Sequence, residues 1–349
     1  LESFANFLQN TGLYALISSG GIDAVKTIIM IAIACVLLYL AIVKKFEPLL
    51  LLPIAFGMLL SNLPMIKDSS AIMMHTEFFT NPEYMTDGKY INVGYICQHG
   101  GLLDLLYLGV KLGIYPPLIF VGIGCMTDFG PLIANPKSIL LGAAAQFGVF
   151  FTFVGALVLS ALVPSINFGI KEAASIGIIG GADGPTAIYV TKSLAPALLP
   201  AIAVAAYSYM ALIPVIQPPI MKLMTRKKDR MIVMEQLRPV SKTEKILFPI
   251  IVTIIVALII PDAVSLVGCL MLGNLMKESG VVERLTKMAQ NELMNIITLF
   301  LGVTVGATAT ASSFLSAQTI GIIVLGLIAF CFSTAGGLFL GDIMCWVTK

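Results

Sequence analysis

The residues best suited to chemistry in this chain interrupt an otherwise apolar segment. Residues 178–187 read IIGGADGPTA and place one carboxylate, Asp183, among glycines and a proline. Ionisable side chains inside membrane segments are rare, and they generally line an ion pathway or pair with another group. Glycine and proline break the helix and free main-chain groups to face a ligand. The pattern favours a functional site at Asp183 over a surface turn that carries an acidic residue.

Oxygen donors lie close to Asp183 in the sequence. They are the hydroxyl group of Thr186 and the main-chain carbonyls freed at Gly180 or Gly181. Because small hard cations take oxygen ligands, these residues predict a cation site. A proton relay is the second possibility, since a buried carboxyl group can exchange a proton near neutral pH. The residues alone leave both roles open.

Further polar residues follow in apolar surroundings. Tyr207 and Tyr209 lie in the segment 205–219, and tyrosine hydroxyls in mid-membrane need hydrogen-bond partners. A functional role and anchoring at the membrane surface both fit the pair, and the functional role fits Tyr209 better. Asp128 ends another apolar run, where a functional role and a solvated helix end fit equally well.

The composition indicates an all-α polytopic membrane protein. Of 349 residues, 58% are hydrophobic and only 11% are charged, which no water-soluble protein of this size requires. Because no Walker A, GxSxG, HExxH or dinucleotide-binding motif occurs, ATP-driven transport by this chain is not expected. We expect no nucleic-acid partner. Apolar runs of spanning length cover residues 24–43, 48–64, 115–134, 138–163, 194–224, 293–311 and 317–347.

The basic residues predict the orientation of these runs. The positive-inside rule places Lys44, Lys45 and the basic segment 226–245 in the cytoplasm. Four spanning runs lie between these two basic loops and return the chain to the same side of the membrane. If 173–191 were a fifth crossing, the two basic loops would lie on opposite sides. The parity therefore predicts that 173–191 is a re-entrant hairpin, which enters from outside with Asp183 near its tip. Irregular backbone at that depth must be buried in protein or line a cavity.

An internal repeat also emerges from the sequence. Three short motifs recur in the same order: 59–63 with 271–275, 101–106 with 280–285, and 119–124 with 299–304. Because the two copies start from opposite sides, they predict inverted repeats, which place a binding site near the membrane midplane. We expect a first repeat at 1–192 with its broken-helix half-site, a connecting helix and basic loop at 193–245, and a second repeat at 246–349. The second half-site would begin beyond Lys349, so we expect the native protein to continue past it.

Several long motifs closely resemble one family, the β subunits of the biotin-dependent, sodium-translocating decarboxylases. The motifs are SIGIIGGADGPTAIYV, LAPALLPAIAVAAYSYMALIPVIQPPIMKLMT, KKFEPLLLLPI, MTDFGPLIANPKSILLGAAAQFG and GNLMKESGVVERL. Family members act on oxaloacetate, methylmalonyl-CoA, glutaconyl-CoA or malonate. The resemblance implies a multi-pass subunit of the bacterial inner membrane that decarboxylates carboxybiotin, takes up a proton from outside and exports sodium ions. It also implies a carboxyltransferase α subunit, a biotin carrier protein, a small membrane γ/δ subunit and a homo-oligomer.

The resemblance assigns roles to single residues. Asp183 matches the essential sodium-coupling aspartate of the family, and Tyr209 matches a functional tyrosine, which would lie near carboxybiotin. The family's remaining site residues, in a second broken segment, have no counterpart before Lys349. The stretch 90–115 resembles the CoA-thioester decarboxylases more than the oxaloacetate type. The alternatives are a sodium-coupled secondary transporter with inverted repeats and no chemistry, and a scaffold subunit without a site.

Overall fold

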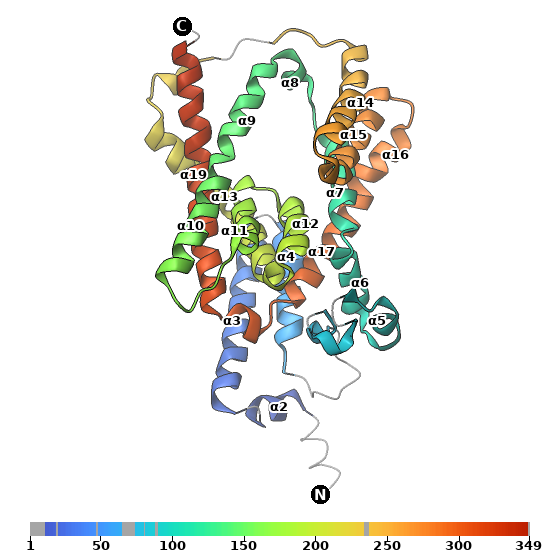
Figure 1. Ribbon diagram of the computed structural model, residues 1–349, viewed down its shortest axis with the longest axis vertical. Coiled ribbons are helices and arrows are strands. Elements are labelled where there is room, and N and C mark those ends of the chain that lie inside the picture. The colour runs from blue at the N-terminus through green and yellow to red at the C-terminus, as the bar shows by residue number, and fades with distance from the viewer. Residues whose placement is uncertain are drawn as a thin grey trace, which may run out of the picture.

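The computed structural model describes residues 11–18, 20–46, 48–64, 74–79, 81–87, 90–233 and 237–347. In these ranges the chain is almost entirely helical, as predicted, and the strands are a short antiparallel pair, β1 (Met85–Thr86) and β2 (Tyr90–Ile91). Figure 1 shows long helices running roughly along the long axis of the molecule. The fold is therefore that of an all-α membrane protein.

Three helical stretches in the described ranges are long and apolar enough to cross a membrane. They are α3 (Gly21–Ile42), the stretch Pro136–Leu162 and α19 (Ala317–Val347). The middle stretch consists of η3 (Pro136–Ser138), α9 (Ile139–Ala145) and α10 (Phe147–Leu162). A fourth is formed if α6 (Leu102–Lys111) and α7 (Tyr115–Met126), which are bent by 70°, make one broken span. Large apolar side chains such as Phe150 and Leu258 are exposed, as lipid contact requires.

The remaining helices of the described ranges fall into three groups by length. The longer ones are α4 (Pro48–Asn62), α13 (Leu199–Met224), α14 (Lys242–Ile259), α15 (Val264–Ser279) and α17 (Met294–Ala307). The short α-helices are α2 (Gly12–Ser18), α5 (Val93–His99), α8 (Gly130–Ala134), α11 (Ile170–Gly177), α12 (Gly184–Leu194), α16 (Glu283–Met288) and α18 (Ala311–Phe314). Single turns are η1 (Thr76–Phe79), η2 (Pro82–Tyr84), η4 (Ile178–Gly181), η5 (Pro196–Leu198), η6 (Asp229–Met231), η7 (Pro261–Ala263) and the π-helical η8 (Ala289–Leu293).

Two helix pairs pack in closely similar ways. Helix α4 packs along α17, and α15 packs along α7. A Cβ atom on Gly57 of α4 would overlap the Val303 carbonyl oxygen, and one on Gly273 of α15 would overlap that of Val121. Such close approach at small residues is typical of helix pairs in membranes, where dispersion contacts replace the hydrophobic effect.

Buried asparagines strengthen both pairs. Asn62, at the end of α4, donates a hydrogen bond to the carbonyl of Ala309, just beyond α17 (2.8 Å). Asn274 of α15 donates to the carbonyl of Thr127, just beyond α7 (3.2 Å). Each asparagine thus binds a main-chain oxygen where the partner helix ends. Asn62 and Asn274 occupy equivalent places in the predicted repeat, so these two contacts are consistent with it. The inverted orientation and the domain boundaries stay predictions.

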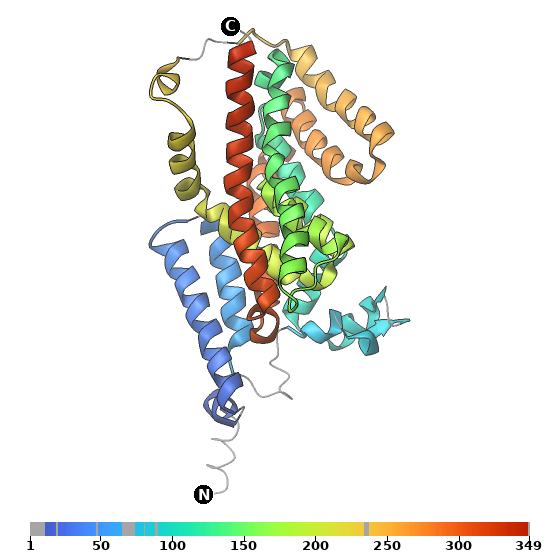
Figure 2. The ribbon, with the colours of Figure 1, turned by 60° about the vertical axis from the view of Figure 1, so that its left-hand side comes forward.

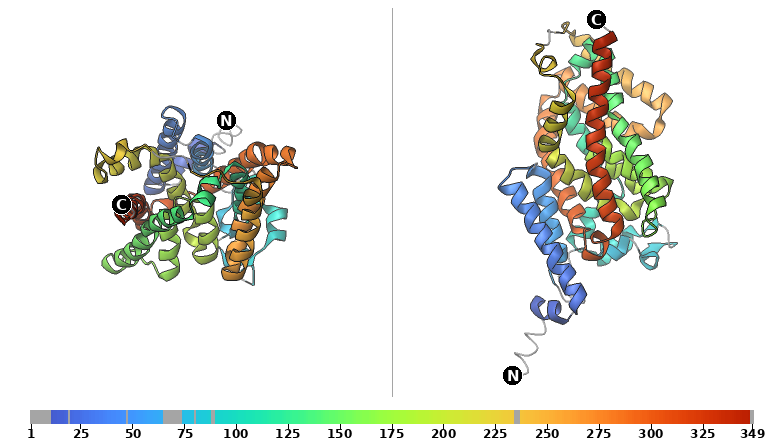
Figure 3. Two further views of the ribbon diagram at one scale, coloured as in Figure 1. Left: turned by 90° about the horizontal axis from the view of Figure 1, so that it is seen from above. Right: turned by 90° about the vertical axis from the view of Figure 1, so that its left-hand side faces the viewer.

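The site region is formed by helices from the middle and from the end of the described chain. Helices α11 and α12 lie side by side, with η4 between them (Figure 1), so the segment 173–191 is interrupted where the sequence predicts. This broken segment packs against α10, α13 and α19, and α12 also contacts α7. Seen from above, α19 runs beside α13 and α10 (Figure 3), and α3 and α4 lie side by side (Figure 2).

Ion pairs hold part of the basic segment at one end of the molecule. Lys245 lies 3.6 Å from Asp128 and 3.8 Å from Glu278. Asp128 also accepts a hydrogen bond from the Gly130 amide (2.9 Å), which is the chief cause of the lowered pKa of its carboxyl group. Asp128 is thus a solvated residue that links the α7–α8 turn to α14. The structure favours this structural role over a place in the site.

The α7–α15 contact can be tested with one methyl group. Gly273→Ala should lower the stability of the purified protein by about 1–3 kcal/mol, because the added Cβ must push the α7 backbone away. Gly268→Ala on the same helix is the control, since its nearest neighbour would be 3.7 Å away. Thermal unfolding in detergent measures both. Equal unfolding temperatures for the two variants would contradict the close approach.

Candidate functional site

The centre of the site is the break between η4 and α12. Ala182 adopts a left-handed conformation (φ 54°, ψ 34°), and Asp183 is the N-cap residue of α12, with Pro185 in the first turn. The Asp183 carboxylate accepts hydrogen bonds from the amide of Thr186 (3.4 Å) and from its hydroxyl group. An aspartate cap followed by proline is a strong helix-start pattern, so the local sequence dictates this turn.

The broken segment approaches its neighbours very closely. A Cβ atom on Gly180 would lie 2.8 Å from the Gly148 carbonyl carbon of α10. On the other side of the break, a Cβ atom on Gly184 would overlap the ring of Tyr207. Larger residues would therefore displace the break from α10 and α13. The glycines fix where Asp183 lies.

The structure brings Asp183 and Thr186 together, as the cation-site hypothesis requires. Asp183 is half-buried, and Gly180 and Gly181 form the turn that precedes it. Among the described residues, no group of three or more histidine, cysteine or acidic residues could hold a metal ion. A lone carboxylate supplies a single negative charge, which matches a monovalent cation or a proton better than a divalent ion.

The two tyrosines of α13 point in different directions. The Tyr209 hydroxyl donates a hydrogen bond to the carbonyl of Ile323 on α19, and its ring lies against Gly326. Tyr207 instead packs on Gly184, next to Asp183, and its side chain is fully buried. The structure therefore places Tyr207 against the break and the hydroxyl of Tyr209 against α19. The sequence drew attention to both tyrosines but favoured Tyr209 as the functional one.

Buried hydroxyl groups without a hydrogen-bond partner cluster in this part of the sequence. Within the described residues there are four, one on each of α10, α11, α12 and α13: Thr152, Ser175, Thr191 and Tyr207. An unpaired buried polar group costs about 1–3 kcal/mol, so native proteins keep few of them. These unpaired hydroxyl groups make the interior of the helices around the break more polar than the sequence pattern indicated.

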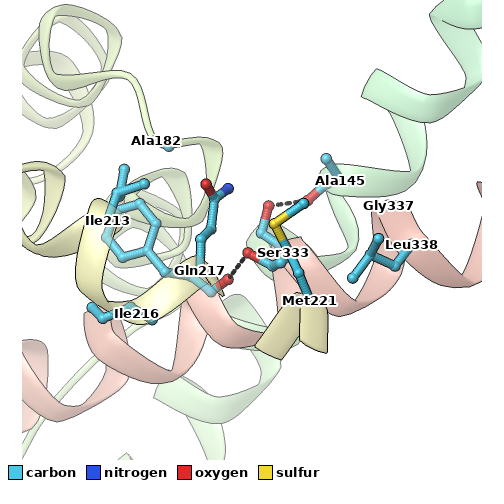
Figure 4. Close-up of a pocket in the computed structure, with 11 residues that line it drawn as sticks. Ala145, Ala182, Ile213, Ile216, Gln217, Met221, Ser333, Gly337 and Leu338 are labelled. Carbon is cyan, nitrogen blue, oxygen red and sulfur yellow. Dashed lines mark hydrogen bonds between the residues drawn. The ribbon is translucent and has the colours of Figure 1, made fainter. Parts of the chain in front are cut away.

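A pocket of about 250 Å³ opens beside the break. Figure 4 shows Ala182 at its edge and the side-chain amide of Gln217 from α13 extending into it. Ser333 and Thr334 of α19 also line it; they donate hydrogen bonds to the carbonyls of Ala145 (2.6 Å) and Phe330 (2.9 Å). The remaining lining is mostly apolar. Sequence reasoning missed the contribution of α19, whose Ser333 and Thr334 lie more than 110 residues from Gln217 along the chain.

Comparison with known proteins identifies the family. Residues 26–349 match the family described as the Na⁺-transporting oxaloacetate decarboxylase beta subunit. The methylmalonyl-CoA decarboxylase subunit beta of Propionigenium modestum is 54% identical over 349 residues, which cover 100% of this chain and 84% of that protein.

Two further relatives differ in the substrate that their names give. The glutaconyl-CoA decarboxylase subunit beta of Acidaminococcus fermentans is 53% identical over 90% of this chain and 75% of its own length. The oxaloacetate decarboxylase beta chain of Klebsiella pneumoniae is 48% identical over 99% of this chain and 84% of its own length. The resemblance read from the sequence is confirmed, and the transporter without chemistry and the bare scaffold are set aside. The chain belongs to the Na⁺-transporting oxaloacetate decarboxylase beta subunit family, whose members are membrane subunits of sodium-pumping decarboxylases.

Proposed function

We propose that this subunit decarboxylates carboxybiotin on a carrier protein and couples that reaction to sodium export through Asp183. In the reaction, the bond between the ureido nitrogen and the carboxyl carbon breaks. The electron pair stays on nitrogen, which takes up a proton, and CO₂ leaves. The observation that carries the proposal is a half-buried carboxylate at a helix break with a hydroxyl group beside it.

Charge balance explains how Asp183 couples the two processes. An unpaired charge taken out of water costs several kcal/mol, so the carboxylate needs a cation or a proton. Sodium would bind Asp183 with the Thr186 hydroxyl and carbonyls of Gly180 or Gly181 as further ligands. Thr186 donates its proton to Asp183, which leaves the lone pairs of the hydroxyl oxygen free to face the ion. Because sodium and a proton compete for one carboxylate, proton uptake from outside would release sodium there.

The proposed assembly follows the resemblance. A carboxyltransferase α subunit would load the biotin carrier protein, and a small γ/δ subunit would accompany this chain in the bacterial inner membrane, where the chain forms a homo-oligomer. Of the possible substrates we favour a CoA thioester. The stretch 90–115 supports that choice, and relatives named for methylmalonyl-CoA and glutaconyl-CoA share 54% and 53% identity with this chain. The predicted inverted repeat would supply the second half of the site.

The central prediction concerns charge at residue 183. Asp183→Asn keeps the shape of the N-cap but removes the negative charge, so sodium loses its main ligand. We expect the variant to assemble normally, to lose sodium-stimulated decarboxylation and to transport no sodium into vesicles. Tyr209→Phe should reduce turnover less, because it removes one hydroxyl group that is bonded to α19. Sodium-stimulated turnover and transport that persist in Asp183→Asn would refute the role of this residue.

Adjacent glycines provide a matched pair of variants. Gly180→Ala should abolish sodium-stimulated turnover, because the new methyl group would collide with the α10 backbone and shift the break. Gly181→Ala keeps its carbonyl and meets nothing closer than 3.7 Å, so it should retain most of the activity. Turnover at saturating and limiting sodium measures both variants. Equal activity would show that the position of the break does not matter.

The predicted re-entrant hairpin can be tested by labelling single cysteines from either side of the membrane. Single cysteines at Lys171 and Lys192, in a background without native cysteines, should both react with a membrane-impermeant maleimide from outside. A cysteine at Lys227 should react only from the cytoplasmic side, because it lies in the basic segment. If Lys192→Cys is labelled only from the cytoplasm, the segment crosses the membrane and the hairpin is wrong.

A further inference from the structure

The pocket beside Ala182 has the character of a small-molecule site. Its volume of about 250 Å³ approaches the lower end of the usual range, ~300–1,000 Å³. Apolar side chains such as Ile213, Met221 and Phe330 form most of its wall. Ligand pockets are commonly apolar with a few polar groups that fix orientation. A small fused ring fits this lining better than a bare ion does.

One polar group in this pocket is free to recognise a ligand. Ser333 and Thr334 donate their hydroxyl protons to main-chain carbonyls, whereas the exposed side-chain amide of Gln217 makes no hydrogen bond to any residue that the structure describes. A carboxamide carries one acceptor oxygen and a donor NH₂ group. A cyclic urea presents the complementary pair, a C=O acceptor beside an N–H donor. Gln217 can therefore form two parallel hydrogen bonds with a urea that is substituted on only one nitrogen.

The position of the pocket suits a charged ligand that a soluble carrier delivers. The pocket reaches from Ala182, next to Asp183, to Met221 near the end of α13. Four basic residues and one acidic residue lie between 226 and 230, in the segment that the positive-inside rule places in the cytoplasm. Basic residues that follow the pocket in this way raise the local concentration of an anionic group. A carboxylate inside the pocket would lie close to the break that holds Asp183.

We propose that this pocket receives the bicyclic ring of carboxylated carrier biotin, with the Gln217 amide paired to the ureido C=O and the unsubstituted N–H. The inference rests on the proposed function and adds the place where the substrate binds. The ring packs against the apolar wall formed by α13 and α19, and the carboxyl group points toward the α12 break. Gln217 is a binding residue for the carboxylated ring, and Asp183 is the residue that responds to sodium.

Cross-linking locates the ring directly. Biotin with a photoreactive diazirine on its valerate chain is irradiated with the intact decarboxylase complex, and the modified peptides are identified by mass spectrometry. We expect modification of 213–221 and 330–338 that excess biotin suppresses and that Gln217→Leu strongly reduces. Modification confined to other segments, or modification that does not change in Gln217→Leu, would overturn the proposal.

Single-turnover kinetics separates this pocket from the sodium site. The carrier is carboxylated in sodium-free buffer, sodium is added, and loss of the carboxyl group is followed in vesicles. Gln217→Leu should slow the decay roughly ten- to hundredfold, the effect of leaving the bound urea unpaired, with half-saturating sodium unchanged. The control is Val215→Leu on the same helix, whose native side chain is 52% exposed and outside the pocket lining; it should decay at the wild-type rate.

The remaining outcomes point to different conclusions. A raised half-saturating sodium concentration in Gln217→Leu, with cross-linking unchanged, would make the pocket an entrance for sodium and contradict our assignment. Co-purified lipid in the pocket that biotin does not displace would contradict it as well. If Asp183→Asn keeps its sodium response while cross-linking still maps to this pocket, the coupling role of Asp183 fails and the binding site stands. The two proposals can therefore fail separately.

Discussion

A helix that is interrupted among apolar residues must find partners for the main-chain groups that the interruption frees, because lipid offers none. In this protein that requirement is met around Ala182. The Ala182 amide donates to the carbonyl of Ile179, and the Asp183 side chain accepts from the amide of Thr186. The carboxylate that we assign to ion coupling therefore also caps the helix. Under that assignment, cation binding would be linked to the local geometry of the backbone through one side chain.

The rest of the fold serves to hold this break in place. Helices α10, α13 and α19 surround it, and Gly180 allows it to approach α10 at close range. Next to these helices, α4 packs with α17 and α7 packs with α15, and in each pair a buried asparagine binds a carbonyl at the end of the partner helix. Helix ends away from water thus obtain side-chain partners. Polar side chains at a few positions thus form the hydrogen bonds that irregular backbone would otherwise lack.

Charge and polarity are distributed in a way that fits transport driven by decarboxylation. One acidic residue marks the break, the adjoining pocket is mostly apolar, and the basic residues follow the end of α13. The basic residues would attract an anionic substrate. Inside the apolar pocket the substrate would lose water, so a carboxyl group bonded to nitrogen would be less well solvated there. The four unpartnered hydroxyl groups found among the described residues lie on α10, α11, α12 and α13, and they offer polar contacts within these helices. Under the two proposals, the pocket for the substrate would adjoin the ion-coupling carboxylate and be lined by other residues.

The sequence by itself determined the class of protein, the family and the place of the break. The apolar composition excluded a soluble fold. Glycine, proline and an aspartate cap defined the start of α12, because helix-start signals act within a few residues. The long motifs specified the decarboxylase family, and similarity over the whole chain confirms it.

Only the tertiary structure decided which side chains meet at the break. Tyr207 and Tyr209 are two positions apart on a helix, about 200° around its axis, so the sequence predicts that they face different neighbours but not which ones. Packing places Tyr207 against Gly184 and the Tyr209 hydroxyl on α19. The pocket likewise joins Gln217 to Ser333 and Thr334 of α19. Such contacts depend on how distant helices pack, and helix periodicity carries no information about the identity of the neighbouring helix.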